Sequence, residues 1–258
     1  MCTLTWFLKD DGYELFFNRD ERVTRQRALL PSLASQNDVR YIAPTDADEG
    51  GTWIAVNHFG VTVCLLNHYQ FEQIKTYKAW ISRGELVRQF ADTVDIGVAE
   101  QQFSHLELSD YRAFRMFIID ATGANRLLVW DGHSPRIERN VNKPKSSSAV
   151  DAKYVKQSRR KLFESTVGGQ AATVERYIDF HRSHLPSKSQ ESVCMHRADA
   201  LTVSLSHISV NAAAAAFSYT DGSPCETNFG ETLILPRNGE FGEFESQAGN
   251  KEQVSSRG

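Results

Sequence analysis

The chain has 258 residues, 41% of them hydrophobic and 10% aromatic, which is enough apolar material for one large core. The formal net charge is −3, without the basic excess of nucleic-acid-binding proteins, so we expect no nucleic-acid partner. No apolar run has the length of a membrane span, and the first residues lack the basic and then apolar order of a signal peptide.

The four cysteines, Cys2, Cys64, Cys194 and Cys225, are widely spaced and form no CxxC pair. This spacing indicates neither a zinc site nor a disulfide framework. We therefore expect a reduced, cytoplasmic location and no bound metal.

Residue 2 is the strongest candidate for chemistry. Removal of Met1, which a small second residue permits, would leave a thiol and a free α-amino group together on Cys2. The reference pKa values of these groups are about 8.5 and 8, so the residue would carry both a nucleophile and its base. The plain alternative is that a small second residue occurs here by chance.

A hairpin is predicted next. Thr3–Lys9 and Tyr13–Phe17 are strand-like and flank an Asp-Asp-Gly turn signal. The returning strand would bring Asn18, Arg19 and Asp20 alongside Cys2. A nearby cation lowers a thiol pKa, and a carboxylate can orient an ammonium group.

Arg19 and Asp20 are adjacent, and successive side chains of a regular strand point to opposite faces. Both can face Cys2 only if the strand ends or bulges near Arg19. We therefore predict an interruption of regular pairing at residues 18–20, and a higher thiol pKa when Arg19 is removed.

Residues 22–50 are polar and irregular, which predicts a long loop over the mouth of the site. Arg22, Arg25 and Arg27 within it either attract an anionic substrate group or are simply solvated.

A second hairpin is predicted from Thr52–Asn57 and Val61–Leu66, which are apolar on both faces and therefore suit the interior of a layered sandwich. Asn67 follows the second strand. Ser82 and Glu85 then form a capping box at a helix start.

The remaining elements alternate between strands and helices. Strands are predicted over Tyr111–Asp120, Arg126–Asp131 and Arg136–Val141. One helix is predicted to begin near Ala149 or Val150, and a second to cover Ala171–His181. Lys143–Ser148 is interpreted as a polar connector. Helices that follow two sheets favour an αββα sandwich.

A late strand has Leu201, Val203 and Leu205 at alternate positions, predicted to point inward, with Thr202, Ser204 and Ser206 outward. Two more strands are predicted over Ala212–Tyr219 and Thr232–Leu235. One domain over residues 1–246 and a disordered tail over residues 247–258 complete the prediction.

The string Phe17-Asn18-Arg19-Asp20-Glu21 resembles the signature of the NRDE family, the transport-and-Golgi-organisation group. The resemblance extends to Gly50-Gly51-Thr52-Trp53, Val61–Asn67 and Ser82–Val87, and it covers most of the chain. The family is similar in fold to N-terminal-nucleophile hydrolases such as penicillin V acylases and bile-salt hydrolases.

The resemblance implies an α+β fold, a four-layer αββα sandwich. It also implies an amidohydrolase or acyltransferase that needs no cofactor and acts on a non-peptide C–N bond of a small acylated substrate. Asn67 would help hold the oxyanion, or else merely ends its strand. Arg197 matches an Arg that the family places ahead of a strand, where it would tune the thiol, bind a carboxylate or form a surface ion pair.

In the acylases a second oxyanion-hole Asn lies near the connector that corresponds to Lys143–Ser148. This chain departs from that pattern, because it has Ser146, Ser147 and Ser148 there and Asn142 earlier in the sequence.

A competing function is haem binding and trafficking, because some NRDE-family members are associated with haem. Cys2, His58, His68, His196 and His207 are the candidate contacts. The chain has no CxxCH motif, so such a haem would be exchangeable. A lone histidine is, however, more often packed or solvated than a ligand.

Overall fold

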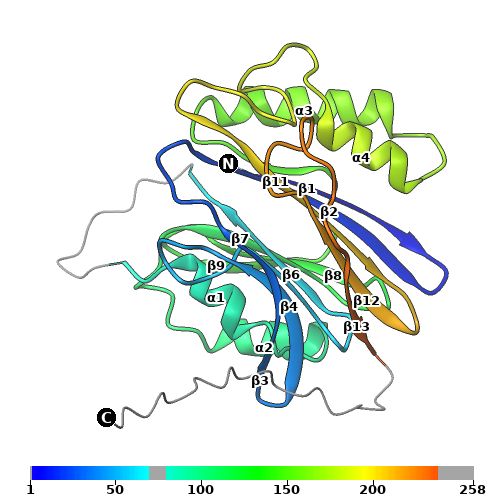
Figure 1. Cartoon of the computed structure of the whole chain (residues 1–258). Helices are drawn as coiled ribbons and strands as arrows, with labels where there is room; N and C mark the ends of the chain where they lie inside the picture. The colour runs from blue at the N-terminus through cyan, green and yellow to red at the C-terminus, as the bar shows by residue number, and fades with distance from the viewer. Residues whose placement is uncertain (1, 70–79, 238–258) are drawn as a thin grey trace, which may run out of the picture.

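The computed structural model describes residues 2–69 and 80–237. Two antiparallel sheets lie face to face, and helices cover the outer face of each sheet, giving four layers (Figure 1). The predicted α+β, αββα architecture is confirmed. Met1 and the tail expected to be disordered, residues 247–258, lie outside the described residues.

The first sheet has the strand order β10-β1-β2-β11-β12-β13. Its strands are β1 (Cys2–Lys9), β2 (Gly12–Arg22), β10 (Lys145–Ser147), β11 (Ala200–Val210), β12 (Ala214–Tyr219) and β13 (Leu233–Pro236). Helices α3 (Ala152–Thr166) and α4 (Val174–Arg182) pack on this sheet.

The second sheet follows the chain from β3 to β9 in order. Its strands are β3 (Leu29–Gln36), β4 (Val39–Thr45), β5 (Ile54–Asn57), β6 (Thr62–Asn67), β7 (Phe114–Ile119), β8 (Asn125–Trp130) and β9 (Pro135–Glu138). Helices α1 (Arg83–Gln89) and α2 (Ile96–Ser104) cover it.

The core between the sheets follows from alternation along the first hairpin. Leu4 and Trp6 of β1, with Leu15 and Phe17 of β2, point toward the second sheet and are almost completely buried. The Trp6 ring lies 4.4 Å from the ring of Phe117 on β7, measured between centroids. The intervening residues of β1 and β2 point the other way, toward α3 and α4.

The helix side of the first sheet has its own apolar cluster. Phe16 of β2 packs against Tyr177 of α4, with ring centroids 5.3 Å apart, and Phe163 and Phe180 extend the contact. A strand that carries two buried faces is therefore fixed in register from both sides.

Residues 22–50 do not form the long loop that was predicted. They contain the β3–β4 hairpin at the edge of the second sheet, joined by Asn37 and Asp38, both with positive φ (48° and 62°). Positive φ at both turn residues is the backbone of a tight hairpin turn. Leu29 and Leu33 remain substantially exposed, so this edge strand lacks the apolar alternation that identifies a strand in sequence.

Two further predictions are wrong in detail. Lys143–Ser148 is not only a connector, because β10 within it pairs with β1. Ser82 is the N-cap of α1, but its side chain makes no capping hydrogen bond.

The inward and outward assignment of β11 is right for Leu205, which is fully buried, but wrong for the other five residues. Thr202, Ser204 and Ser206 are fully buried, whereas Leu201 and Val203 are partly exposed. The register of β11 on β2 shifts between Thr202 and Ser204, which reverses the faces on the two sides of the shift.

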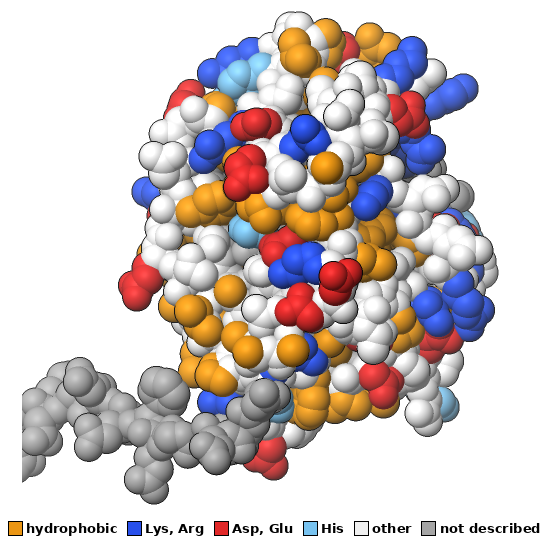
Figure 2. Space-filling model, turned by 90° about the vertical axis from the view of Figure 1, so that its right-hand side faces the viewer, with side chains coloured by type: hydrophobic (Ala, Val, Ile, Leu, Met, Phe, Trp, Pro, Cys, Tyr) orange, Lys and Arg blue, Asp and Glu red, His pale blue; other side chains and the backbone are white. Residues whose placement is uncertain are grey.

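No helix in the described part of the chain is long and apolar enough to cross a membrane. On the face drawn in Figure 2, basic and acidic side chains are interspersed and no continuous basic region is present.

Candidate active site around Cys2

Cys2 is the first residue of β1, and its neighbours on either side are Ser147 of β10 and Arg19 of β2. The residue is only 8% exposed, yet it lines a cavity of about 630 Å³. The same cavity is lined by the other residues predicted for the hydrolase site, which are Arg19, Asp20, Asn67 and Arg197. The fold thus brings together side chains from four separate parts of the sequence.

Arg19 is the direct cross-strand partner of Cys2, so the two side chains stand on the same face of the sheet. Its guanidinium lies 3.8 Å above the Trp53 ring and donates a 2.5 Å hydrogen bond to Asp46 Oδ2. The Glu21 carboxylate lies 3.6 Å away. Stacking and ion pairing therefore hold the Arg19 side chain in one position at the cavity wall.

Asp46 is a shared acceptor in this wall. Arg25 Nη2 lies 2.8 Å from the Asp46 carboxylate oxygen that Arg19 also contacts. Burial would raise the pKa of Asp46, but Arg25 and Arg19 outweigh it and hold that pKa below its usual value. Asp46 is therefore ionised at neutral pH and neutralises much of the charge of Arg19.

Asp20 reaches Cys2 through its backbone and not through its carboxylate. Its N–H donates to the Cys2 sulfur, while its side chain accepts a 2.6 Å hydrogen bond from Thr202 on the helix side of the sheet. Arg159 of α3 lies 3.6 Å from the other carboxylate oxygen.

The interruption predicted at residues 18–20 is present, but it lies in the partner strand. β2 continues to Arg22 as a regular strand, and the register shift on β11 leaves Val203 as the extra residue opposite Arg19 and Asp20. The consequence drawn from it was wrong, because Arg19 and Asp20 still point to opposite faces. Asn18 likewise faces the helices, where it donates to the carbonyl oxygens of His181 and Val193.

Burial raises the pKa of the Cys2 thiol to about 11, and the Asp20 and Glu21 carboxylates add to this, while the N–H of Asp20 opposes it. Cys2 is therefore a neutral thiol at neutral pH. A reaction at its sulfur needs a base that takes the proton as the bond forms.

Asn67 ends β6, as predicted, and lies at the cavity wall. Its side-chain amide donates a 2.6 Å hydrogen bond to the Tyr69 hydroxyl. In the described part of the chain no residue of Lys143–Ser148 lines the cavity. The connector therefore supplies no counterpart of the second oxyanion-hole Asn of the acylases.

Arg197 lies ahead of β11 and forms a bidentate pair with Asp199, at 2.9 and 2.6 Å. The Asp199 side chain is largely exposed. This geometry matches the surface ion pair considered as the alternative role of Arg197, although the residue also borders the cavity.

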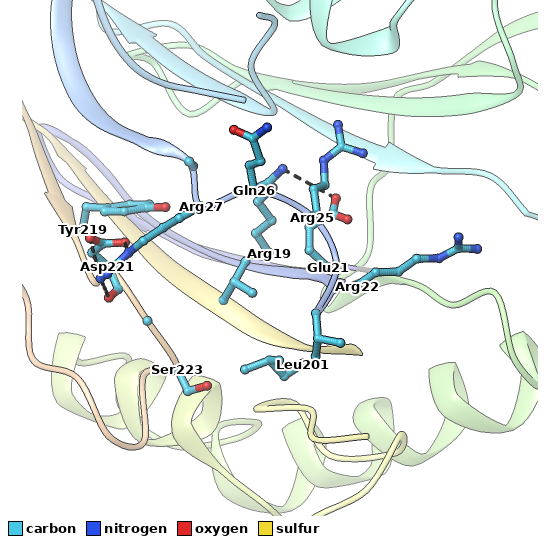
Figure 3. A pocket seen from close by; sticks show the side chains of 14 residues that line it. Arg19, Glu21, Arg22, Arg25, Gln26, Arg27, Leu201, Tyr219, Asp221 and Ser223 are labelled. Atoms are coloured by element: carbon cyan, nitrogen blue, oxygen red, sulfur yellow. Dashed lines mark hydrogen bonds and ion pairs between the residues drawn. The ribbon is translucent and has the colours of Figure 1, made fainter. Parts of the chain in front are cut away.

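Figure 3 shows a second, smaller cavity of about 260 Å³. Arg19, Glu21, Arg22 and Arg25 border both cavities and form a shared wall, and we refer to the two cavities as the larger and the smaller lobe of the cleft. The smaller lobe has an apolar wall made of Val23, Ala28, Leu201, Val203 and Tyr219. Arg27 borders it and pairs with Asp221 at 2.7 Å.

The four histidines proposed as haem contacts lie apart from the cavity. None of His58, His68, His196 and His207 is among the described residues that line either lobe. His58 occupies the turn of the β5–β6 hairpin, at the opposite end of β6 from Asn67, and its Nδ1 accepts from the N–H of Arg40.

The other three histidines have separate surroundings. His68 is buried, and burial together with the charge of Arg115 lowers its pKa to about 4. His207 pairs with Glu14 at 2.7 Å and stacks on Phe16. His196 contacts Cys194 and Cys225. The residues of the haem hypothesis therefore do not form one site around Cys2.

Sequence reasoning missed Asp46, Tyr69 and Arg159. Asp46 stood in an acidic run that reads as surface, and Tyr69 followed a strand end without any periodic signal. Arg159 is fully buried although it belongs to a basic Ser-Arg-Arg-Lys run of α3. Only the three-dimensional proximity of Asp20 distinguishes it from its exposed neighbours.

Two facing antiparallel sheets between helix layers are the fold of the N-terminal-nucleophile hydrolases. The C2A mutant of conjugated bile acid hydrolase from Clostridium perfringens has a TM-score of 0.54 at 11% identity, over 92% of this chain and 93% of that one. Penicillin V acylase from Agrobacterium tumefaciens has a TM-score of 0.51 at 8% identity, over 86% and 83%.

A third similar structure is the Caenorhabditis elegans N-acylethanolamine-hydrolyzing acid amidase ortholog, with a TM-score of 0.55 at 12% identity, over 92% of this chain and 100% of that one. The chain belongs to the Transport and Golgi organisation 2 family, whose sequence profile matches residues 1–234. Curated protein sequences give no significant match.

Proposed function

We propose that this protein is an N-terminal cysteine amidohydrolase or acyltransferase that cleaves a non-peptide C–N bond of a small acylated substrate. The observation that carries the proposal is the position of Cys2. It is the first residue of a strand inside the sheet, it lines the larger lobe of the cleft, and Arg19 stands directly across from it.

The raised thiol pKa of Cys2 defines what the reaction requires. Once Met1 is removed, the α-amino group of Cys2 takes the thiol proton while Sγ bonds to the amide carbonyl carbon. The carbonyl oxygen becomes an oxyanion, which the Asn67 amide N–H stabilises. Collapse breaks the C–N bond, the ammonium proton passes to the leaving amine, and a thioester remains for attack by water or by an acceptor amine.

The two-lobed cleft indicates the kind of substrate. The smaller lobe, with Leu201, Val203 and Tyr219, suits an apolar acyl group. Arg83 and Arg112 border the larger lobe, and neither has a carboxylate partner within ion-pair distance among the described residues. A substrate with an anionic group beside the scissile amide would complement these two cations.

Intact mass and a chromogenic assay test this function together. Protein made in a bacterial cytosol should lack the mass of Met1 and should release p-nitroaniline from N-acyl p-nitroanilides, in a series from acetyl to dodecanoyl. Cys2→Ala should abolish release, and Cys64→Ala is the matched control, since Cys64 is a buried core cysteine outside the cleft. Equal activity of the Cys2→Ala variant would refute the proposal.

Haem binding is the alternative function. Of the five residues expected to contact haem, Cys2 lines the cavity and the four histidines do not. Haemin titration followed by the Soret band discriminates the two functions. A Soret shift that Cys2→Ala abolishes, in a protein that keeps Met1, would favour the carrier function over the hydrolase.

A further inference from the structure

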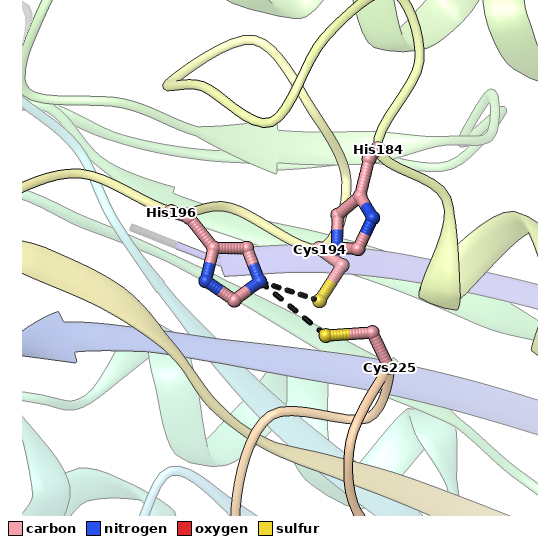
Figure 4. A group of neighbouring side chains, drawn as sticks. All are labelled: His184, Cys194, His196 and Cys225. Carbon is pink, nitrogen blue, oxygen red and sulfur yellow. Dashed lines mark hydrogen bonds between the residues drawn. The ribbon is translucent and has the colours of Figure 1, made fainter.

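A cluster of four side chains outside the Cys2 site has the composition of a metal centre. His184, Cys194, His196 and Cys225 place one donor atom each within 4.8 Å of all the others (Figure 4). His184 follows α4, Cys194 and His196 precede β11, and Cys225 lies in the connection from β12 to β13. The α4–β11 and β12–β13 connections therefore meet at this point.

Two of the distances within the cluster match the edges of a tetrahedral ligand set, and all four donor atoms lie within 4.8 Å of one another. The His196 Nε2 atom lies 3.5 Å from the sulfur of Cys194 and 3.4 Å from the sulfur of Cys225. Zinc bonds of about 2.3 Å to sulfur and about 2.0–2.1 Å to nitrogen give a tetrahedron with edges of roughly 3.3–3.8 Å. Both distances fall within that interval.

The His184 side chain supplies an independent observation. Its Nε2 atom is buried and has no hydrogen-bond partner among the described residues, and the imidazole ring is directed toward the two cysteines (Figure 4). A buried polar atom without a partner carries an uncompensated desolvation cost. A metal bond to Nε2 would satisfy it.

The two thiols contact each other and share one nitrogen of His196. Cys194 is fully buried, and a single His196 nitrogen contacts both sulfurs, although it has at most one proton to share between them. A divalent cation would bind both sulfurs as thiolates and displace their protons to solvent.

We propose that His184, Cys194, His196 and Cys225 bind one zinc ion in a closed, four-coordinate Cys₂His₂ site. Four protein ligands leave no open position for a substrate, so the site is structural and not catalytic. The wide spacing of the cysteines had predicted no metal site. The ligands lie in loops that come together only in the folded protein, so the sequence contains no compact zinc-binding motif.

The position of the site gives it a role in shaping the cleft. Met195, which lies between two of the ligands in sequence, and Arg197 both line the larger lobe. The Met195 N–H donates a 2.8 Å hydrogen bond to Thr202, whose hydroxyl also contacts Asp20. Ser223, two residues before Cys225, borders the smaller lobe. The zinc ion would thus fix the loop that forms one wall of the cleft.

Metal analysis of the full-length protein tests the proposal. Protein purified under reducing conditions should contain about one equivalent of zinc per chain by inductively coupled plasma mass spectrometry. Reconstitution with cobalt chloride should produce the intense d–d bands of tetrahedral Co²⁺ and a thiolate-to-cobalt charge-transfer band. Cys225→Ser and His184→Ala should lose both signals.

Matched variants locate the metal. Cys64→Ala and Cys2→Ala should keep the full zinc content, as should His133→Ala, which removes an exposed histidine. In case the ligand variants do not fold, a chelator added to the wild-type protein should release the metal and lower its melting temperature. Absence of zinc and of cobalt bands in reduced, folded wild-type protein would overturn the proposal, as would a Cys194–Cys225 disulfide in protein prepared with reductant.

Discussion

Arg159 of α3 and Asp20 of β2 form an ion pair at 3.6 Å in which neither side chain is exposed to solvent. Arg159 also donates to the Thr3 hydroxyl and to the carbonyl oxygens of Gln190 and Glu191. One buried guanidinium therefore connects α3, the first hairpin and the loop ahead of β11. The strand that holds Cys2 is supported from behind by this pair.

The first prediction concerns the stability of this pair. Asp20→Asn removes the counter-charge of a buried guanidinium, and the free energy of unfolding should fall by about 3–5 kcal/mol. Urea denaturation measures the change. A double variant, Asp20→Asn with Arg159→Met, should lose less than the sum of the two single variants, because the second substitution removes the unpaired charge. Additive losses would show that the two residues do not interact.

The second prediction is a pH dependence that originates at His181. Its two ring nitrogens contact Asn18 and Thr5, at 2.9 and 2.8 Å, and burial lowers its pKa to about 3. In the unfolded chain the pKa of a histidine is about 6.5. Between about pH 3 and pH 6.5 the unfolded chain therefore binds a proton at His181, whereas the folded chain does not. Stability is therefore lost as the pH falls below about 6.5, by up to about 1.4 kcal/mol per pH unit.

Urea unfolding from pH 7 to pH 4.5 measures this dependence. His181→Gln should have a lower free energy of unfolding than the wild type at pH 7. The difference in unfolding free energy should narrow as the pH falls, because the unfolded wild type gains a proton at His181 and the variant has no such group. A difference that stays constant over this interval would mean that the folded protein protonates His181 as easily as the unfolded one.

Much of the architecture was predictable because local signals and the global fold agree. The Asp-Asp-Gly turn and the apolar alternation around it define the first hairpin. β5 and β6 are continuous apolar runs, and α3 and α4 follow helical periodicity. The β3 and β10 strands were missed because edge pairing by polar or exposed residues leaves no periodic signature.

The placement of Cys2, Arg19 and Asn67 at one cavity was predictable, because Cys2 and Asn67 lie at strand ends and the first hairpin pairs Arg19 with Cys2. The side-chain direction of Asp20 follows from plain alternation in β2, which stays regular because the bulge lies in β11, so the expectation that Arg19 and Asp20 both turn toward Cys2 was wrong. The Cys₂His₂ cluster was invisible, since its ligands meet only through loops that the sheets position.

The third prediction tests the oxyanion role of Asn67 and applies if the protein hydrolyses amides as proposed. Asn67→Ala should lower kcat by about 10²–10³-fold, as expected for the loss of one donor to the transition-state oxygen. Tyr69→Phe is the matched control, because it removes only the hydroxyl that Asn67 contacts at 2.6 Å. An equal loss in both variants would indicate that the pair is structural.

The last prediction concerns the charges around the Cys2 thiol. The guanidinium of Arg19 neutralises Asp46 and Glu21, whose carboxylates stand on the cleft side of the sheet. Arg19→Ala leaves these carboxylates with less compensation, so the pKa of Cys2 should rise above its present value of about 11. Glu21→Gln should have the opposite effect, because the Glu21 carboxylate itself raises that pKa.

Alkylation by iodoacetamide as a function of pH, read at the Cys2 peptide by mass spectrometry, measures both shifts. A change of one pKa unit alters the thiolate fraction, and hence the rate at a fixed pH below the pKa, about tenfold. Arg19→Lys keeps the charge but loses the planar stack on Trp53, so it should fall between the wild type and Arg19→Ala. Identical profiles for Arg19→Ala and Glu21→Gln would show that neither charge reaches the thiol, and would leave burial and the Asp20 carboxylate as the causes of its high pKa.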